Sequence, residues 1–127
     1  MLRIGTTVMG VHDFRRAVAF WTAALDYTPR DPIGDQDDYV VLVPTHGAGA
    51  HLALDTSVSP VQEMPRVHLD LYAGDAADQA AEVERLVALG AARVDWPLYP
   101  PNPDFVVLAD TEGNRFCVID TSHEPET

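Results

Sequence analysis

Apolar residues recur with two different periods along the chain. In 13–25, Phe14, Val18, Trp21 and Leu25 return every three or four positions, which is the spacing of one helix face. The segment 75–90 shows the same spacing. Elsewhere apolar and polar residues alternate, which predicts strands. The predicted strands are 2–9, 27–30, 38–44, 49–55, 66–72, 92–96, 104–109 and 115–120.

The second half of the chain repeats the first. Residues 39–57 and 105–122 both run from an aromatic residue through Val-Val-Leu to a turn, another apolar strand and a closing Asp-Thr-Ser. Asp13 and Asp75 each precede a predicted helix, and aspartate is a favoured N-cap because its carboxylate accepts the free N–H groups of the first turn. The repeat predicts an α+β fold of two tandem βαβββ modules.

We expect one domain over residues 1–127. Module 1 covers about 1–57, a polar, proline-bearing linker covers 58–64, module 2 covers about 65–122, and a short polar tail follows at 123–127. One module alone would leave a sheet face uncovered, so the modules should pack together within the chain or exchange with a second chain. A homodimer is expected as well.

Composition excludes several classes of protein. The net charge of −12 argues against binding nucleic acid, and with eight basic residues that are all arginine, Schiff-base chemistry through lysine is excluded. No apolar run approaches the ~20 residues that cross a bilayer. The single cysteine, Cys117, excludes an intrachain disulfide, and the first residues do not resemble a signal peptide, which predicts a cytoplasmic protein.

The segment 65–75, PRVHLDLYAGD, carries the first candidate site. Alternation places His68, Asp70 and Tyr72 on one face of a strand. An imidazole can transfer protons near neutral pH, so His68 is a candidate general acid or base; the alternative is a solvated remnant. Asp70 could orient His68 or bind a cation, but residues two apart on a strand lie roughly 7 Å apart, which favours a polar wall of a cleft.

Two residues near the C-terminus alternate onto one face. Arg115 could pair with an anionic group of a substrate, or be a surface arginine beside the turn. Cys117 could be a nucleophile, but a small buried cysteine is the commoner case.

A stiff, aromatic segment lies between the last predicted strands. Residues 94–105, VDWPLYPPNPDF, contain Trp96, Tyr99 and Phe105 among four prolines. Three aromatic residues favour contact with a ligand, whereas the prolines alone would also suit protection of a sheet edge.

Three motifs in this order and spacing resemble the vicinal oxygen chelate superfamily, in its glyoxalase-like branch. VHDFRRAVAFWTAAL (11–25) is similar to that family's first helix, PRVHLDL (65–71) to the opening of its second module, and DTEGNRF (110–116) to its Asp-Pro-x-Gly-Asn turn, with Thr111 in place of proline. The resemblance implies two modules whose sheets curl around a cleft. In metal-dependent members it also implies a divalent ion, held by the first and last strand of each module.

The resemblance maps the four metal-binding positions onto Thr6, Leu52, His68 and Cys117. Counting back from the N-cap aspartates matches Thr6 to His68, and counting back from the Asp-Thr-Ser copies matches Leu52 to Cys117. A hydroxyl, an isobutyl group, an imidazole and a thiol are a poor set for an octahedral ion. We therefore predict no metal and no other cofactor.

One alternative keeps a metal. A register shift of one residue on strand 49–55 would replace Leu52 by His51 or Ala53. His51, His68 and Cys117 would then form a conceivable zinc trio, with Asp70 as a further donor.

Two functions of different classes follow from the resemblance. The first is a metal-independent lyase or isomerase that acts on a small molecule, with His68 as the proton carrier. The second is a non-catalytic protein that sequesters a small aromatic or cationic compound, as bleomycin-resistance relatives do; a metal-dependent lyase or dioxygenase comes third. The predicted ligand-binding residues are Thr6, Leu52, Asp70, Tyr72, Trp96, Tyr99, Phe105, Arg115 and Cys117.

Overall fold

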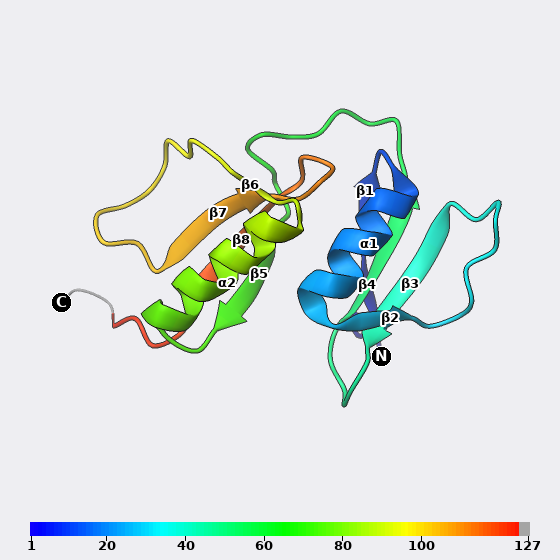
Figure 1. Cartoon of the computed structure of the whole chain (residues 1–127), viewed down its shortest axis with the longest axis horizontal. Helices are drawn as coiled ribbons and strands as arrows, with labels where there is room; N and C mark the ends of the chain where they lie inside the picture. Colours follow the sequence, from blue (N-terminus) through cyan, green and yellow to red (C-terminus); the bar gives the residue numbers. More distant parts are fainter. Residues whose placement is uncertain (125–127) are drawn as a thin grey trace. The chain divides into compact units, whose positions relative to one another are not determined.

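A computed structural model of the chain describes residues 1–124 and divides into two compact units, with the boundary between Pro60 and Val61 (Figure 1). Each unit runs strand, helix and three strands, and each contains a four-stranded mixed sheet. The predicted α+β fold of repeated βαβββ modules is confirmed. Of the tail predicted at 123–127, residues 125–127 lie outside the described part.

The first unit orders its sheet β1-β4-β3-β2, with β1 parallel to β4 and the other neighbours antiparallel. Its elements are β1 (Thr6–Val11), α1 (Phe14–Leu25), β2 (Tyr27–Pro29), β3 (Tyr39–Pro44) and β4 (His51–Thr56).

The second unit repeats this topology as β5-β8-β7-β6, with β5 parallel to β8. Its elements are β5 (Leu69–Ala73), α2 (Ala76–Leu89), β6 (Ala92–Arg93), β7 (Phe105–Ala109) and β8 (Arg115–Asp120).

Both helices begin where the sequence predicts. The Asp13 carboxylate accepts the backbone N–H of Arg16 at 3.1 Å, and the Asp75 carboxylate accepts that of Asp78 at 2.7 Å. Gly90, at φ 123°, ends α2 in a conformation that side chains disfavour. Neither helix has the length and apolar character needed to cross a membrane.

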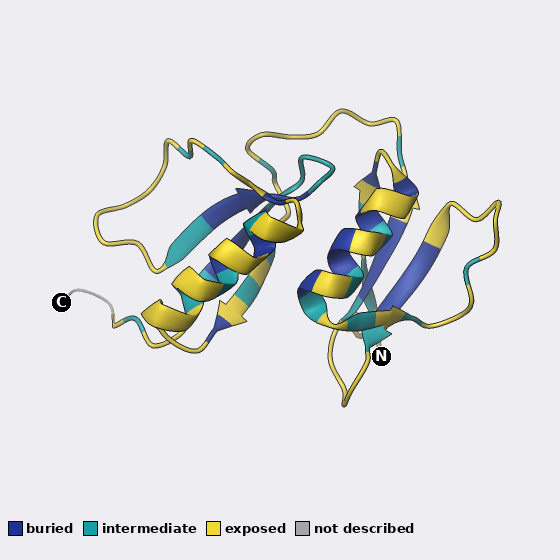
Figure 2. Cartoon of the chain, viewed as in Figure 1, coloured by how far each residue is buried: buried dark blue, intermediate teal, exposed yellow. Residues whose placement is uncertain are grey.

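Each helix covers one face of the sheet in its own unit. The buried side of α1 carries Phe20 and Trp21, whose rings meet edge to face at 5.0 Å, and the buried side of α2 carries Val83 and Leu86. Dark blue residues on the helices and central strands mark these cores in Figure 2. The other face of each sheet keeps exposed side chains, so each unit has a covered face and an open face.

Several strands begin or end at other residues than predicted, because the ends are set by pairing with the neighbouring strand. β1 starts at Thr6, not at residue 2, because its ladder with β4 begins at the pair Thr6 and His51. β5 starts at Leu69, which leaves His68 immediately before the strand. β6 ends at Arg93, and the chain then enters the proline-rich segment.

The turn between β7 and β8 fixes the start of β8. The Asp110 carboxylate accepts the backbone N–H groups of Glu112 and Asn114, both at 2.9 Å. Gly113 lies at φ 89°, as expected for a tight turn. These hydrogen bonds fix the turn, so they also fix the position of Arg115, the first residue of β8.

We predict that Asp75→Ala lowers the free energy of unfolding by about 1 kcal/mol, since α2 loses the side-chain acceptor of its first turn. Urea denaturation followed by circular dichroism measures this. Glu63→Ala is the matched control, because Glu63 is an exposed carboxylate of the same unit outside its helices and strands. Equal destabilisation by both substitutions would contradict the capping role.

Candidate ligand-binding site

The open face of the second sheet carries a pocket of about 570 Å³, formed by β5, β7, β8 and the segments that flank them. Its lining includes most of the residues that the sequence singled out in this half of the chain. The lining residues are Pro65, His68, Asp70, Tyr72, Trp96, Leu98, Asp104, Phe105, Val107, Arg115, Phe116, Cys117 and Ile119.

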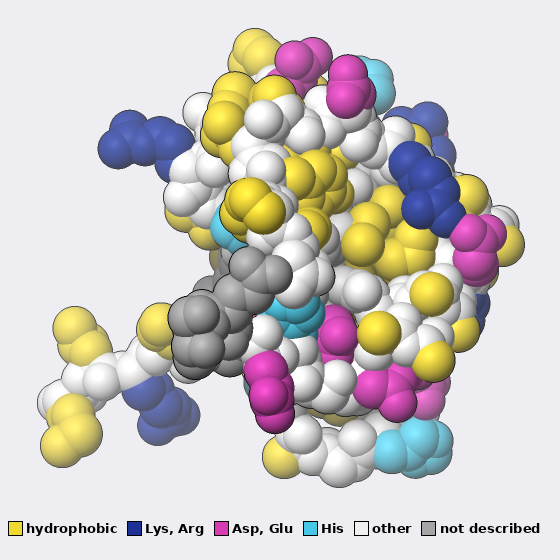
Figure 3. Space-filling model, turned by 90° about the vertical axis from the view of Figure 1, so that its left-hand side faces the viewer, with side chains coloured by type: hydrophobic (Ala, Val, Ile, Leu, Met, Phe, Trp, Pro, Cys, Tyr) yellow, Lys and Arg dark blue, Asp and Glu magenta, His cyan; other side chains and the backbone are white. Residues whose placement is uncertain are grey.

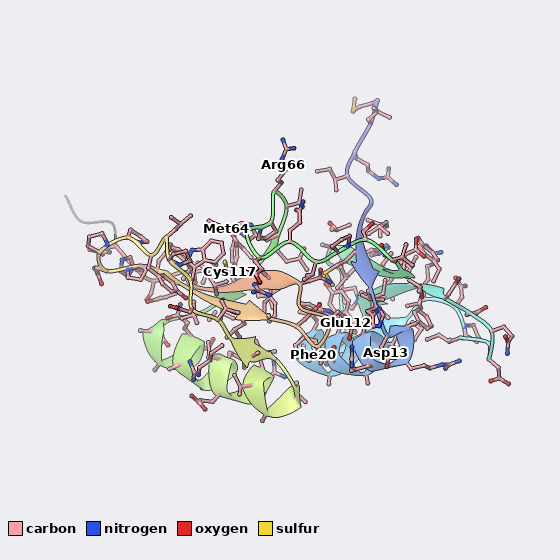
Figure 4. The ribbon with its side chains drawn as sticks, turned by 90° about the horizontal axis from the view of Figure 1, so that it is seen from above. Asp13, Phe20, Met64, Arg66, Glu112 and Cys117 are labelled. Carbon is pink, nitrogen blue, oxygen red and sulfur yellow. The ribbon has the colours of Figure 1, made fainter. Side chains whose placement is uncertain are left out.

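Strand pairing explains why these residues meet. Asp70 pairs with Cys117 across the parallel β5–β8 ladder, and Val107 pairs with Cys117 across the antiparallel β7–β8 ladder. Paired residues point to the same face of a sheet, and alternation adds the residues two positions away on each strand. Cys117 lies on the side of the sheet away from α2 (Figure 4).

His68 and Asp70 are in direct contact. The His68 Nε2 and the Asp70 Oδ1 lie 3.0 Å apart, although strand spacing alone favoured separate roles. Because His68 precedes β5 and is not held in its ladder, its side chain can lean toward Asp70. Both side chains remain reachable from solvent, at 44% and 46% exposed. An Nε2–H donated to Asp70 leaves Nδ1 as the acceptor nitrogen.

Cys117 is nearly covered, and its thiol is not activated. Burial raises the pKa of the Cys117 thiol to about 11, and the neighbouring Asp70 and Asp104 carboxylates add to the rise. At neutral pH the group is therefore a neutral thiol rather than a thiolate nucleophile. This agrees with the simpler of the two sequence interpretations.

The aromatic segment has two structural roles. Trp96 and Leu98 line the pocket. The Tyr99 hydroxyl instead accepts the backbone N–H of Val107 at 2.7 Å, and its ring stacks at 5.2 Å on that of Phe105. Tyr99, predicted as a ligand contact, lies outside the lining and protects the edge of β7. The contact of Tyr99 agrees with protection of the sheet edge, and ligand contact by Trp96 stays a prediction.

Leu52 lies elsewhere than the sequence suggested. It is 4% exposed and pairs with Thr7 on β1 and Leu42 on β3. The opposite face of the same sheet carries Val8, at 55% exposed. Since α1 covers only one face, Leu52 belongs to the core beneath the helix and not to the open face.

The repeat explains this difference. Thr6 and His68 both stand seven residues before an N-cap, as expected, but the ladders then match Cys117 to Ala53. The Asp-Thr-Ser motif begins two residues after Ala53 but three residues after Cys117. Counting back from the motif therefore gives a position that is wrong by one residue. On the open face of the first unit, Thr6 stands beside His51. The one-residue shift considered from sequence is thus observed.

Six lining residues were not predicted from the sequence: Pro65, Leu98, Asp104, Val107, Phe116 and Ile119. Ile119 alternates with Arg115 and Cys117 on β8, and Val107 alternates with Phe105 on β7, so strict alternation would have found both. Asp104 precedes β7 and gave no periodic signal.

Comparison with known proteins places the chain in a family. Residues 6–119 match a family model described as a glyoxalase-like domain. The chain therefore belongs to the glyoxalase-like domain family, within the vicinal oxygen chelate superfamily. No curated protein matches it.

Solved structures share the fold at low identity. A glyoxalase-related enzyme from Fulvimarina pelagi superposes with a TM-score of 0.71 at 16% identity, covering 100% of this chain and 94% of that one. A mutant of the fosfomycin resistance protein FosX from Listeria monocytogenes, complexed with Mn(II) and a dihydroxypropylphosphonic acid, gives 0.70 at 15% identity and covers 94% and 92%. A glyoxalase/bleomycin resistance protein/dioxygenase family enzyme from Burkholderia phytofirmans gives 0.67 at 15%, with 92% and 97% covered.

The residues at the family's metal positions are a poor set for Mg²⁺ or Mn²⁺. In the first unit, Ala53, the counterpart of Cys117, offers no side-chain donor atom, and Thr6 offers only a hydroxyl. In the second unit, donor atoms of His68, Asp70 and Cys117 do lie within 4.8 Å of one another. Asp70 is engaged by His68, and Cys117 is a neutral thiol at neutral pH because burial raises its pKa to about 11. The set is too small and too soft for Mg²⁺ or Mn²⁺.

We predict that Cys117 reacts slowly with iodoacetamide at pH 8 and faster as the pH approaches 11, because only the thiolate attacks. Asp70→Asn should lower the thiol pKa and raise the rate at pH 8, since it removes a negative charge that opposes ionisation. Mass spectrometry of the alkylated protein against pH measures both rates. Glu63→Gln, outside the pocket, should leave the profile unchanged; a midpoint near the ordinary cysteine value would contradict the assignment.

Proposed function

We propose that this glyoxalase-like protein binds a small molecule in the pocket of its second unit and moves a proton on it, as a lyase or isomerase. The observation that carries the proposal is the contact of 3.0 Å between His68 Nε2 and Asp70 Oδ1 within a pocket lining. A carboxylate that holds one imidazole nitrogen fixes the tautomer and stabilises the imidazolium that forms during proton transfer.

The proposed step uses only side chains of the second unit. With Nε2–H directed at Asp70, the Nδ1 lone pair of His68 accepts a proton from a carbon of the ligand. The electron pair of the C–H bond stays on the ligand, and the same nitrogen returns the proton to a second position. Cys117 takes no part as a nucleophile, because burial and nearby carboxylates keep its thiol neutral.

The walls of the pocket favour a ligand with a flat, apolar part. Trp96 and Phe105 supply aromatic surface, and Val107 and Ile119 supply aliphatic surface. A volume of about 570 Å³ is in the range of sites for small molecules.

The same walls support the alternative of a non-catalytic protein that sequesters an aromatic compound. In that case the His68–Asp70 pair would hold the ligand by hydrogen bonds without turnover. The two functions differ only in whether a proton leaves the ligand, so they can be separated by one measurement.

Assembly and location remain proposals from the sequence. We infer a homodimer, supported by apolar side chains that stay exposed, such as Val8 and Tyr39 in the first unit and Val67 in the second. A cytoplasmic location is proposed on the composition alone.

We predict that the protein catalyses exchange of a carbon-bound proton with solvent deuterium in at least one member of a panel of α-hydroxycarbonyl compounds and carbon acids. Proton NMR in D₂O detects this exchange without knowledge of the product. His68→Ala should slow it by about 10²–10⁴-fold, the usual contribution of a general acid–base group. Asp70→Asn should slow it less, because the imidazole remains.

His46→Ala is the matched control, since His46 is an exposed histidine in a turn of the first unit. It should leave exchange unchanged. If the wild-type protein binds a panel member, His68→Ala binds it equally well, and neither exchanges a proton, sequestration is the function.

A further inference from the structure

Arg115 has few partners for an arginine in a pocket lining. Its Nη1 donates to the Gly113 carbonyl at 2.7 Å. Its Nε is buried and has no hydrogen-bond partner within residues 1–124, and no ion pair of that part of the chain includes Arg115. A guanidinium stays charged at every physiological pH, and a buried donor left unpaired costs free energy.

The contact with Gly113 determines which edge of the guanidinium remains. In arginine, Nε–H and Nη2–H lie on the same side and form a planar fork, while Nη1 lies on the other side. Because Nε is buried and Nη1 donates to Gly113, Nη2 is the donor that a carboxylate or another oxyanion in the pocket can meet.

The position of Arg115 relates its guanidinium to the proposed proton carrier. Leu69 and Phe116 form the first pair of the parallel ladder, and His68 and Arg115 are the residues just before that pair. Both line the pocket, so an oxyanion held by Arg115 would lie in the same pocket as the imidazole of His68.

The charged side chains of the pocket indicate which end of a ligand lies where. Asp104 precedes Phe105, which pairs with Ile119, and Ile119 lies four residues along β8 from Arg115, or about 13 Å at strand spacing. An anion is thus favoured at the Arg115 end and disfavoured near Asp104, where a neutral or cationic group fits. Elsewhere on the surface acidic side chains are scattered among hydrophobic ones, as on the face in Figure 3, and the chain carries −12 overall.

We propose that the ligand of this pocket is an aromatic compound with an oxyanion, a carboxylate or a close analogue, which the guanidinium of Arg115 binds through Nη2 in the pocket that it shares with His68. The proposal rests on the proposed function for its site. In the proton transfer, the C–H pair of the carbon next to the carboxylate would spread onto the carboxylate oxygens, and Arg115 would stabilise the added charge. The proton on His68 then returns to the ligand.

The test compares oxyanion probes with neutral ones of the same shape. Benzoate, phenylacetate and phenylphosphonate are titrated into the full chain by isothermal calorimetry, with benzamide and phenylacetamide as neutral counterparts. We expect at least one oxyanion to bind more tightly than its amide. Arg115→Gln should weaken that oxyanion by about tenfold or more and leave the amide unchanged, and Arg115→Lys should restore part of the loss.

Arg93→Gln is the matched control, because Arg93 pairs with Glu84 of α2 and lies outside the lining. It should leave every affinity unchanged, and thermal unfolding of each variant checks that it folds. Failure of all three oxyanions to bind, equal binding of acid and amide, or an equal loss in the Arg93 variant would overturn the proposal.

The proposed function and this inference can fail separately. If proton exchange depends on His68 but Arg115→Gln changes no affinity, only the ligand class is wrong. If Arg115 selects oxyanions and no carbon acid exchanges its proton, the ligand class stands and the catalytic proposal fails.

Discussion

The parallel pairing of β5 with β8 is the constraint on which the site depends. It joins the first and last strand of one βαβββ unit, so residues 47 positions apart, such as Asp70 and Cys117, share one face of a sheet. Asp70 stands beside Cys117 because of this ladder, and His68 and Arg115 immediately precede its first pair, Leu69 and Phe116. A shift of β8 by one residue would turn Arg115 and Cys117 toward the helix face. Burial of Phe116 and Val118 on that face prevents such a shift.

The helix caps and the turn hold this ladder in place. Asp75 starts α2 two residues after β5 ends, which allows the helix to cover the sheet directly. Asp110 and Gly113 form the turn that returns the chain into β8 and sets Arg115 at its start. Since α2 covers one face, the opposite face is left for the pocket, and the segment with Trp96 and Tyr99 lies along its edge. The function proposed for the chain thus follows from which face remains open.

The sequence predicts those features that depend on neighbouring residues along the chain. The N-cap role of Asp75, the positive φ of Gly113 and the shared face of His68 and Asp70 follow from local pattern, and all are observed. The prediction that Leu52 faces the cleft was wrong because the Asp-Thr-Ser motif does not stand at the same distance from the end of the strand in the two units. The contact between His68 and Asp70 depends on where β5 begins, which is set by pairing with β8 rather than by local sequence.

The central claim is that His68 serves as a proton carrier held by Asp70, which it could not do as a ligand of a metal ion. The most direct test is the metal content of protein purified without chelator, measured by elemental analysis alongside His68→Ala. The account predicts far less than one equivalent of zinc, nickel, manganese or iron in both proteins. One equivalent of any of these in the wild-type chain, lost in His68→Ala, would contradict it.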